Sequence, residues 1–299
     1  MSSNLPGLWV LGCVQNGGSH LPNIFANLEK SRDFFSETNI FILENDSSDN
    51  TRLFLSQYRK QRVSLQAKAF QGLNERIPEK TVRLAALRNA GLDWIQSQGA
   101  YDRPNDLVMI LDLDEVNADP WDLSQFEQVL FWFLARHQAG GVFANQKGPY
   151  YDLWAFRHPV LCPHDIWWHV YQMHLRHPQW SDDECLHSGY LPWQVRFDPE
   201  DSPFVVESAF GGLGLYKASW LRKAQAPYCG EQARWLALDD GGVKLLRWQI
   251  AEHVSFHAGL RAAGASLWIY PGWINWNTQV LADRGGLRPN PSSWRFLSF

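Results

Sequence analysis

The stretch VMILDLDEVN at residues 108–117 joins the pattern of a buried strand to a group of acids. Its first half is apolar, and Asp112 and Asp114 then follow with one leucine between them. Because alternate residues of a strand point to the same side, the two carboxylates project together. Like charges so close together repel each other, and a divalent cation relieves that repulsion. The stretch therefore predicts a metal site or phosphate chemistry at the end of a strand.

The composition excludes several classes of protein. The chain has 299 residues and a formal charge of −4, with no dense run of Lys and Arg, so nucleic acid is not an expected partner. No apolar stretch approaches the length of a membrane span, and the N-terminus lacks a signal-like pattern. Four scattered cysteines without a CxxC pair fit free thiols in a reducing compartment. We therefore expect a cytoplasmic protein with no membrane span.

In the first half of the chain, short strand-like runs alternate with amphipathic helical patterns. The strand-like runs are residues 8–15, 39–46, 63–70 and 106–115. Repeated β-α units of this kind form a parallel sheet, whose ligands bind beyond the carboxyl ends of the strands. Neither GxGxxG nor GxxxxGK[ST] is present, so phosphate has to be held by something other than a glycine-rich loop.

We expect one α/β domain over residues 1–299. Its nucleotide-binding half, about residues 8–148, is predicted to be a Rossmann-like sheet. The acceptor-side half, about residues 149–276, is predicted to be mixed and aromatic-rich, followed by a C-terminal tail at 277–299. The run LRWQIAEHVSFHAGLRAAG at residues 246–264 predicts one helix. The 16 tryptophans suit either sugar-binding faces or ordinary core packing.

Six blocks occur in order along the chain: LENDSSDNT, RLAALRNAGL, LDLDE, YYDLWAFRH, FGGLGLYK and EHVSFHAGLRAAG. Together they resemble GT-A glycosyltransferases, in particular the family of fungal capsule-associated α-mannosyltransferases and its bacterial relatives. The resemblance implies a GT-A fold and metal-dependent transfer of a hexose, with mannose from GDP-mannose as the expected donor sugar. It implies Mn²⁺ or Mg²⁺ as cofactor. The implied partners are a GDP- or UDP-linked sugar and a glycan or glycoconjugate acceptor.

The resemblance also assigns roles to individual residues. The implied donor-binding residues are Val14, Glu44, Asn45, Asp46, Arg83, Arg88, Asn89, Asp112, Gly211 and Gly212. The implied metal ligands are Asp112, Asp114 and His257, and the implied catalytic residues are Asp152, Glu252 and His253. For Asp46, helix capping is the alternative role, and for Gly211 and Gly212 it is a turn that needs positive φ.

The third metal ligand is open at this stage. His253 and His257 are four residues apart and so share one helix face, and His257 is the preferred ligand of the two. Asn275 lies near the position where the resemblance implies a late histidine.

Two other functions fit parts of the sequence. ILDLDEV also matches a haloacid dehalogenase-type phosphatase, with Asp112 as nucleophile and Asp114 as acid. Three β-α units precede this strand, however, whereas that nucleophile normally follows the first strand of its domain. A non-catalytic carbohydrate-binding protein is the third possibility, and it predicts sugar binding without metal dependence. Clustered carboxylates without a metal would destabilise such a protein.

Overall fold

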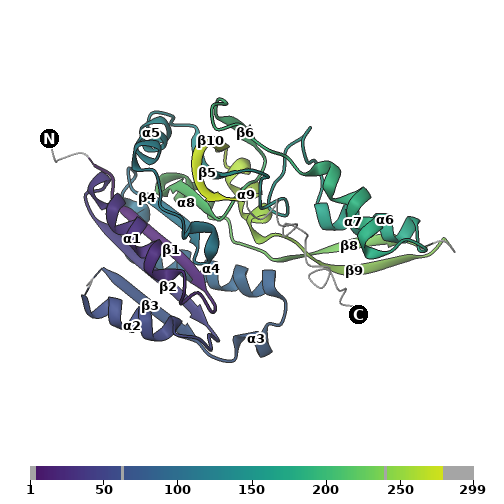
Figure 1. The fold of residues 1–299 in the computed structure, drawn as a ribbon, viewed down its shortest axis with the longest axis horizontal. Helices are drawn as coiled ribbons and strands as arrows, with labels where there is room; N and C mark the ends of the chain where they lie inside the picture. Colours follow the sequence, from purple (N-terminus) through teal and green to yellow (C-terminus); the bar gives the residue numbers. More distant parts are fainter. Residues whose placement is uncertain (1–4, 62–63, 239–240, 279–299) are drawn as a thin grey trace.

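An eight-stranded mixed sheet forms the centre of the protein (Figure 1). The computed structural model describes residues 5–61, 64–238 and 241–278. The strands of this sheet, in the order in which they lie side by side, are β3 (Leu65–Phe70), β2 (Thr38–Asn45), β1 (Leu8–Val14), β4 (Leu107–Asp112), β7 (Leu213–Lys217), β5 (Ala139–Lys147), β10 (Ser266–Asn277) and β6 (Phe204–Val206).

The first four strands are parallel to their neighbours, so their carboxyl ends meet at one edge. Strand β7 lies antiparallel between β4 and β5, while β10 runs parallel to β5. The predicted α/β fold with a mostly parallel sheet is confirmed. All four strand-like runs of the first half form strands, although Val63, at the start of the third run, lies outside the described residues.

Helices cover both faces of the sheet, which is why its strands are apolar on both sides. Along β1, Trp9 and Leu11 pack on one face and Leu8 and Val10 on the other. One face is covered by α4 (Lys80–Ser97), α8 (Ala218–Ala224) and α9 (Glu252–Ala262). The other is covered by α1 (Leu21–Ser31), α2 (Thr51–Gln61) and α5 (Leu123–Leu134), and α3 (Leu73–Arg76) is a short turn before α4.

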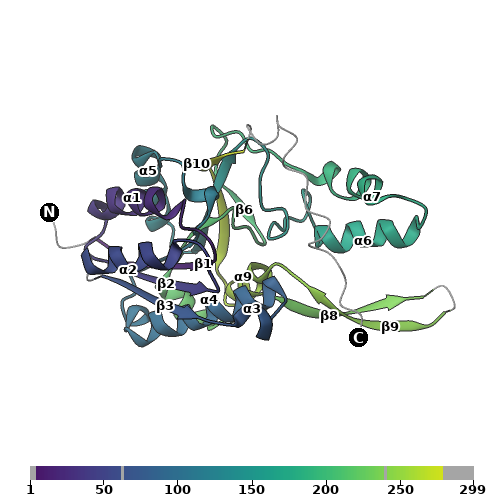
Figure 2. The same ribbon diagram turned by 60° about the horizontal axis from the view of Figure 1, so that its bottom comes forward.

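Two helices and a hairpin project together from the sheet (Figure 2). They are α6 (Ile166–Arg176), α7 (Asp182–Gly189), β8 (Glu231–Ala237) and β9 (Val243–Gln249). Aromatic packing joins them, since the ring of Trp248 on β9 lies 4.9 Å from that of Trp168 and 5.4 Å from that of Tyr171. These tryptophans serve as core packing.

The helix predicted over residues 246–264 is wrong in its first part. Residues 246–249 belong to β9, and α9 begins only at Glu252. Leu246 and Trp248 are two residues apart and buried, so they point to one face of the hairpin, a period that the helical pattern hid.

Within the described residues, no helix combines the length and apolar character needed to cross a bilayer. Of the predicted C-terminal tail, residues 279–299 lie outside the described part of the chain. The division of the domain into two halves stays a prediction, although β7 and β10 of the second half pair into the same sheet as β1 to β4.

Candidate active site

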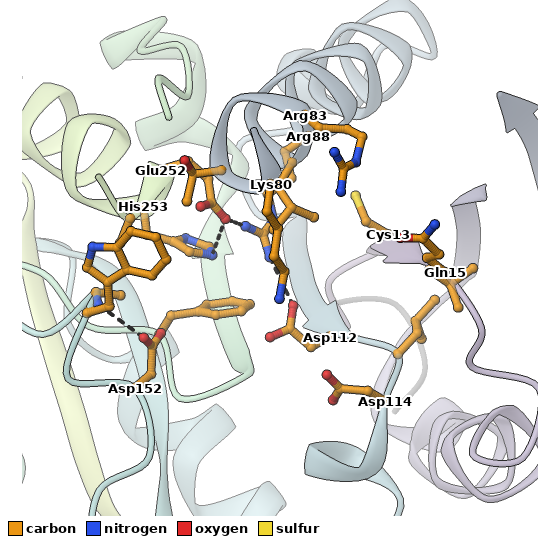
Figure 3. A pocket seen from close by; sticks show the side chains of 18 of the residues that line it. Cys13, Gln15, Lys80, Arg83, Arg88, Asp112, Asp114, Asp152, Glu252 and His253 are labelled. Carbon is orange, nitrogen blue, oxygen red and sulfur yellow. Dashed lines mark hydrogen bonds and ion pairs between the residues drawn. The ribbon is translucent and has the colours of Figure 1, made fainter. Parts of the chain in front are cut away.

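The two acids of the opening stretch lie at the carboxyl edge of the sheet. Asp112 ends β4, where its partner on the neighbouring strand β1 is Cys13. Asp114 follows and accepts a hydrogen bond of 3.2 Å from the backbone N–H of Val116, which starts a short turn. Both carboxylates line a pocket of about 300 Å³ (Figure 3). Both acids therefore border one pocket, although Asp114 lies beyond the strand, and their role as metal ligands stays a prediction.

Nine residues predicted for the site line this pocket. They are Val14, Asn45, Arg83, Arg88, Asp112, Asp114, Asp152, Glu252 and His253. They come from the ends of β1 and β2, from the end of β4 and the residues just after it, from the first half of α4, from the first turn of α9, and from the loop after β5. The segments are far apart in sequence, and the sheet brings them to one edge.

Arg88 joins two of the acids. Its Nη2 lies 2.9 Å from Oδ1 of Asp112, and its Nη1 is paired with Oε1 of Glu252 at the start of α9. The side chain is only 4% exposed, and the rings of Phe210 and Tyr228 lie 5.2 and 5.8 Å from the guanidinium carbon. Arg88 therefore holds Asp112 and Glu252 in place from beneath the pocket.

The carboxyl groups of the pocket are hard to ionise. Burial and, to a smaller extent, the neighbouring charge of Asp114 raise the pKa of Asp112 to about 6, although Arg88 opposes the shift. Burial also raises the pKa of Asp114, and it raises that of Asp152 to about 6. Such a cluster gains stability from a cation that neutralises it.

The donor set fits Mn²⁺ or Mg²⁺, since both prefer carboxylate oxygens. Arg88 donates a hydrogen bond to Oδ1 of Asp112. The carboxylates of Asp112 and Asp114 both face the pocket (Figure 3). In the described part of the chain, no three His, Cys, Asp or Glu side chains form a complete metal cage. An ion here would thus be held by two carboxylates and by oxygens from outside the protein, which is common for Mg²⁺ beside phosphates.

The preference for His257 as the third ligand is corrected by the structure. Its Nδ1 is hydrogen-bonded to Ser208 Oγ and its Nε2 to Tyr216 Oη, both at 2.8 Å. The side chain is fully buried, and burial lowers its pKa to about 3. Both ring nitrogens are occupied and the ring does not line the pocket, so His257 serves as a core residue.

Two predicted donor-binding acids shape a neighbouring loop. Glu44 is buried and accepts a 2.8 Å hydrogen bond from Nε of Arg52. Asp46 accepts from the backbone N–H groups of Gly72 and Asn74 at 2.5 and 2.8 Å, and these bonds lower its pKa. Neither acid lines the pocket. Asp46 binds the loop that leads into α3, whereas at the start of α2, the helix it was expected to cap, the backbone N–H of Thr51 is bound by Asp49.

The remaining predicted residues are also structural. Asn89 exchanges two hydrogen bonds, of 2.9 and 2.7 Å, with the backbone of Tyr228. Gly211 and Gly212 have φ of 62° and 82°, and a Cβ on Gly212 would lie 2.4 Å from Cγ1 of Val116. The turn therefore needs glycine for its conformation, and its neighbour Phe210 lines the pocket in its place.

Several pocket residues escaped the sequence reasoning. Lys80 belongs to none of the six blocks, whereas Tyr151 and Trp154 lie in YYDLWAFRH but were given no role there. Burial raises the pKa of Asp112 and of Asp114, and the positive charge of Lys80 acts in the opposite direction on both. The position of Lys80 at the first turn of α4, beside the acids, is the one signal that points to it.

A chain of buried amides beneath the pocket was also missed. Asn117 Nδ2 donates to the carbonyl oxygens of Asp112 and Gly212, at 2.9 and 2.7 Å. Asn275 Nδ2 donates to Oδ1 of Asn117 at 3.0 Å, and Gln146 Nε2 donates to Oδ1 of Asn275 at 3.0 Å. Both the oxygen and the nitrogen of the Asn275 amide are thus hydrogen-bonded within the protein. Asn275 is the residue near the position where the resemblance implies a late histidine.

Fold and site together define a mostly parallel α/β protein with an acidic, cation-flanked pocket at the strand ends. No family model matches the chain, and no curated protein matches it. Among solved structures it is similar to S. aureus TarS 1-349, with 13% identity and a TM-score of 0.47 over 94% of this chain and 63% of that one. The chain thus spans less than two thirds of that structure.

Two further solved structures show a weaker likeness. Glucosyl-3-phosphoglycerate synthase from Mycobacterium tuberculosis, in complex with UDP, is 12% identical with a TM-score of 0.37 over 94% of this chain and 67% of that one. Mannosyltransferase PcManGT from Pyrobaculum calidifontis, in complex with GDP-Man and Mn²⁺, is 13% identical with a TM-score of 0.38 over 76% and 48%. Function therefore has to be inferred from the residues of the pocket.

Proposed function

We propose that the protein is a metal-dependent glycosyltransferase that moves a hexose from a nucleotide sugar to a carbohydrate-type acceptor. The observation that carries this proposal is the pocket itself, where Asp112 and Asp114 lie beside Lys80 and Arg83 at the carboxyl ends of parallel strands. Carboxylates for a divalent ion next to cationic side chains suit a diphosphate. The sequence resemblance favours GDP-mannose, and a UDP-linked sugar is the other donor to test.

Each side chain of the donor side has a distinct task in this proposal. Asp112 and Asp114 hold Mn²⁺ or Mg²⁺, which when bound supplies positive charge to the diphosphate leaving group. Lys80 and Arg83 add positive charge from α4, where Nη1 of Arg83 is positioned by hydrogen bonds to two backbone carbonyl oxygens. Preorganised charge of this kind is the main source of catalysis in such transfers.

On the acceptor side, two of the three predicted catalytic residues, Glu252 and Asp152, differ in the partners that they already have. Glu252 is committed to Arg88 and so acts as a positioning residue. Asp152 accepts one hydrogen bond of 3.1 Å, from the backbone of Ala155, and burial raises its pKa to about 6. A base with a pKa near neutrality suits removal of a proton from an acceptor hydroxyl. We therefore assign that task to Asp152.

The phosphatase alternative requires Asp112 as a covalent nucleophile. In the structure one of its oxygens is bound by Arg88, which leaves the carboxylate less free to attack a phosphorus atom. A non-catalytic carbohydrate-binding protein would need no metal, so the clustered carboxylates would repel one another without serving its function.

The test is a panel of GDP-mannose, UDP-glucose and UDP-GlcNAc, assayed for release of the nucleoside diphosphate with Mn²⁺ and with chelator. We expect slow release without acceptor, dependent on metal and lost in Asp114→Ala. Turnover of p-nitrophenyl phosphate, with a trapped aspartyl-phosphate and no use of any nucleotide sugar, would establish the phosphatase instead.

A further inference from the structure

One wall of the pocket carries polar groups that have no partner. Nε1 of Trp154 and both ring nitrogens of His253 are buried and lack a hydrogen-bond partner within the described residues. The His253 side chain is 3% exposed, yet it lines the pocket together with Trp154 and Asp152. Figure 3 shows two of these residues, Asp152 and His253, on the side of the pocket away from Arg83.

The ring of His253 is held in place. It stacks on Phe210, with 3.8 Å between ring centroids and 23° between planes, and meets the ring of Tyr228 edge-on at 5.3 Å. Glu252 Oε1 lies 3.9 Å from Nε2, beyond hydrogen-bond distance, and is already paired with Arg88. His253 therefore contributes to the pocket wall a ring whose two nitrogens no described residue satisfies.

The chemistry of the wall matches a hydroxyl-bearing ligand. Burial, reinforced by the charge of Arg88, lowers the pKa of His253 well below its usual value, so the ring is neutral and offers one donor and one acceptor. Trp154 offers one donor and a flat aromatic face, and Asp152 offers an acceptor. A hydroxyl both donates and accepts, whereas a phosphate only accepts and would be repelled by Asp152.

We propose that Asp152, Trp154 and His253 form the subsite that binds hydroxyl groups of a hexose ring, with His253 as a specificity-determining residue. This inference rests on the proposed transferase function and adds the part of the substrate that this wall contacts. Buried polar groups without a partner cost free energy, so a hydroxyl that pairs with them binds more tightly than a group that cannot. The hexose is that of the donor or that of the acceptor, and the experiment separates the two.

The test uses His253→Phe, which keeps an aromatic ring on Phe210 and removes both nitrogens. His187→Phe, on the exposed surface of α7, is the matched control. We expect the melting temperature of His253→Phe to stay the same or rise, because unpaired buried groups are removed. The Kd of GDP or UDP with Mn²⁺ should not change. Catalytic efficiency should fall about tenfold or more, as expected for loss of a hydrogen bond to substrate.

If the wall binds the hexose of the donor, His253→Phe weakens binding of the nucleotide sugar, while the free nucleotide binds as before. If the wall binds the hexose of the acceptor, His253→Phe raises KM for the acceptor and leaves acceptor-free hydrolysis of the donor unchanged. Donor and acceptor KM within twofold of the unmodified protein would overturn the subsite. If His253→Phe does not fold, Trp154→Phe gives the same readout for the indole N–H. Unmodified protein that binds no nucleotide with Mn²⁺ would overturn the transferase function itself, and the subsite with it.

Discussion

Replacing Arg88 with methionine removes a buried cation that is paired with both Asp112 and Glu252. Methionine fills much of the same volume, so the main loss is electrostatic. Truncating one partner of a buried ion pair costs about 3–5 kcal/mol, because it leaves an uncompensated charge behind. With about 2–4 °C of melting temperature per kcal/mol in a chain of this size, we expect Arg88→Met to melt roughly 6 to 20 °C lower at pH 7.

The pH dependence of that loss identifies its cause. The pKa of Asp112 is already raised in the folded protein, and without Arg88 it rises further. A carboxyl whose pKa is raised on folding destabilises the folded protein increasingly from its unfolded pKa up to its folded pKa. The additional loss in the variant therefore falls above the folded pKa of the unmodified protein, about 6. The difference between variant and unmodified protein should therefore shrink from pH 7 to pH 4.5, measured by thermal unfolding with circular dichroism.

A matched control removes an exposed ion pair of similar geometry. Arg261 also lies on a helix and contacts Glu207 at 3.1 Å, but both side chains are more than 40% exposed. Exposed pairs contribute about 0–1 kcal/mol, so Arg261→Met should change the melting temperature by only a few degrees. If Arg88→Met is as stable as Arg261→Met at pH 7, the buried pairing does not hold the site together.

Three further predictions follow from the acids and the turn beneath them. Asp114→Ala should abolish metal-dependent nucleotide release while the fold is retained, because the side chain faces the pocket; release at the unmodified rate would remove the metal site. Mn²⁺ should raise the melting temperature more at pH 7 than at pH 5, because protons compete for Asp112, whose folded pKa is about 6; an equal increase at both pH values would contradict binding at this carboxylate. Gly212→Ala should destabilise the protein by about 1–3 kcal/mol in chemical unfolding, since its φ is 82° and a Cβ would press on Val116; unchanged stability would show that the turn relaxes.

The first four strands could be predicted because each is short, apolar and followed by a helical pattern. Strand β7 could not be placed, since its position between β4 and β5 depends on pairing with residues 71 to 110 positions away. The extent of β10 could not be judged from the sequence either, because register shifts between Ile269 and Trp276 let the strand continue past Pro271.

The residues of the site also differ in how far the sequence could predict their roles. Asp112, Asp114 and Arg88 belong to short motifs whose local spacing already places them at a strand end and on a helix. The role of His257 could not be judged from spacing, because a helical period says which residues share a face and not what covers that face. Ser208 and Tyr216, which occupy its nitrogens, lie more than 40 residues away in sequence.

The buried amides explain how the pocket keeps its shape without adding charge. Asn117 holds the carbonyl of Asp112, and Gln146 accepts the backbone N–H of Tyr151 at 3.0 Å, with Asn275 between the two amides. The acid end of β4 and the acceptor-side loop are therefore parts of one hydrogen-bonded frame, which positions both sides before a ligand arrives. Three carboxyl groups of the pocket already have raised pKa values. A carboxylate at position 275 would add to their repulsion, whereas an amide satisfies the same donors and acceptors and leaves the charge of the site to the ligand.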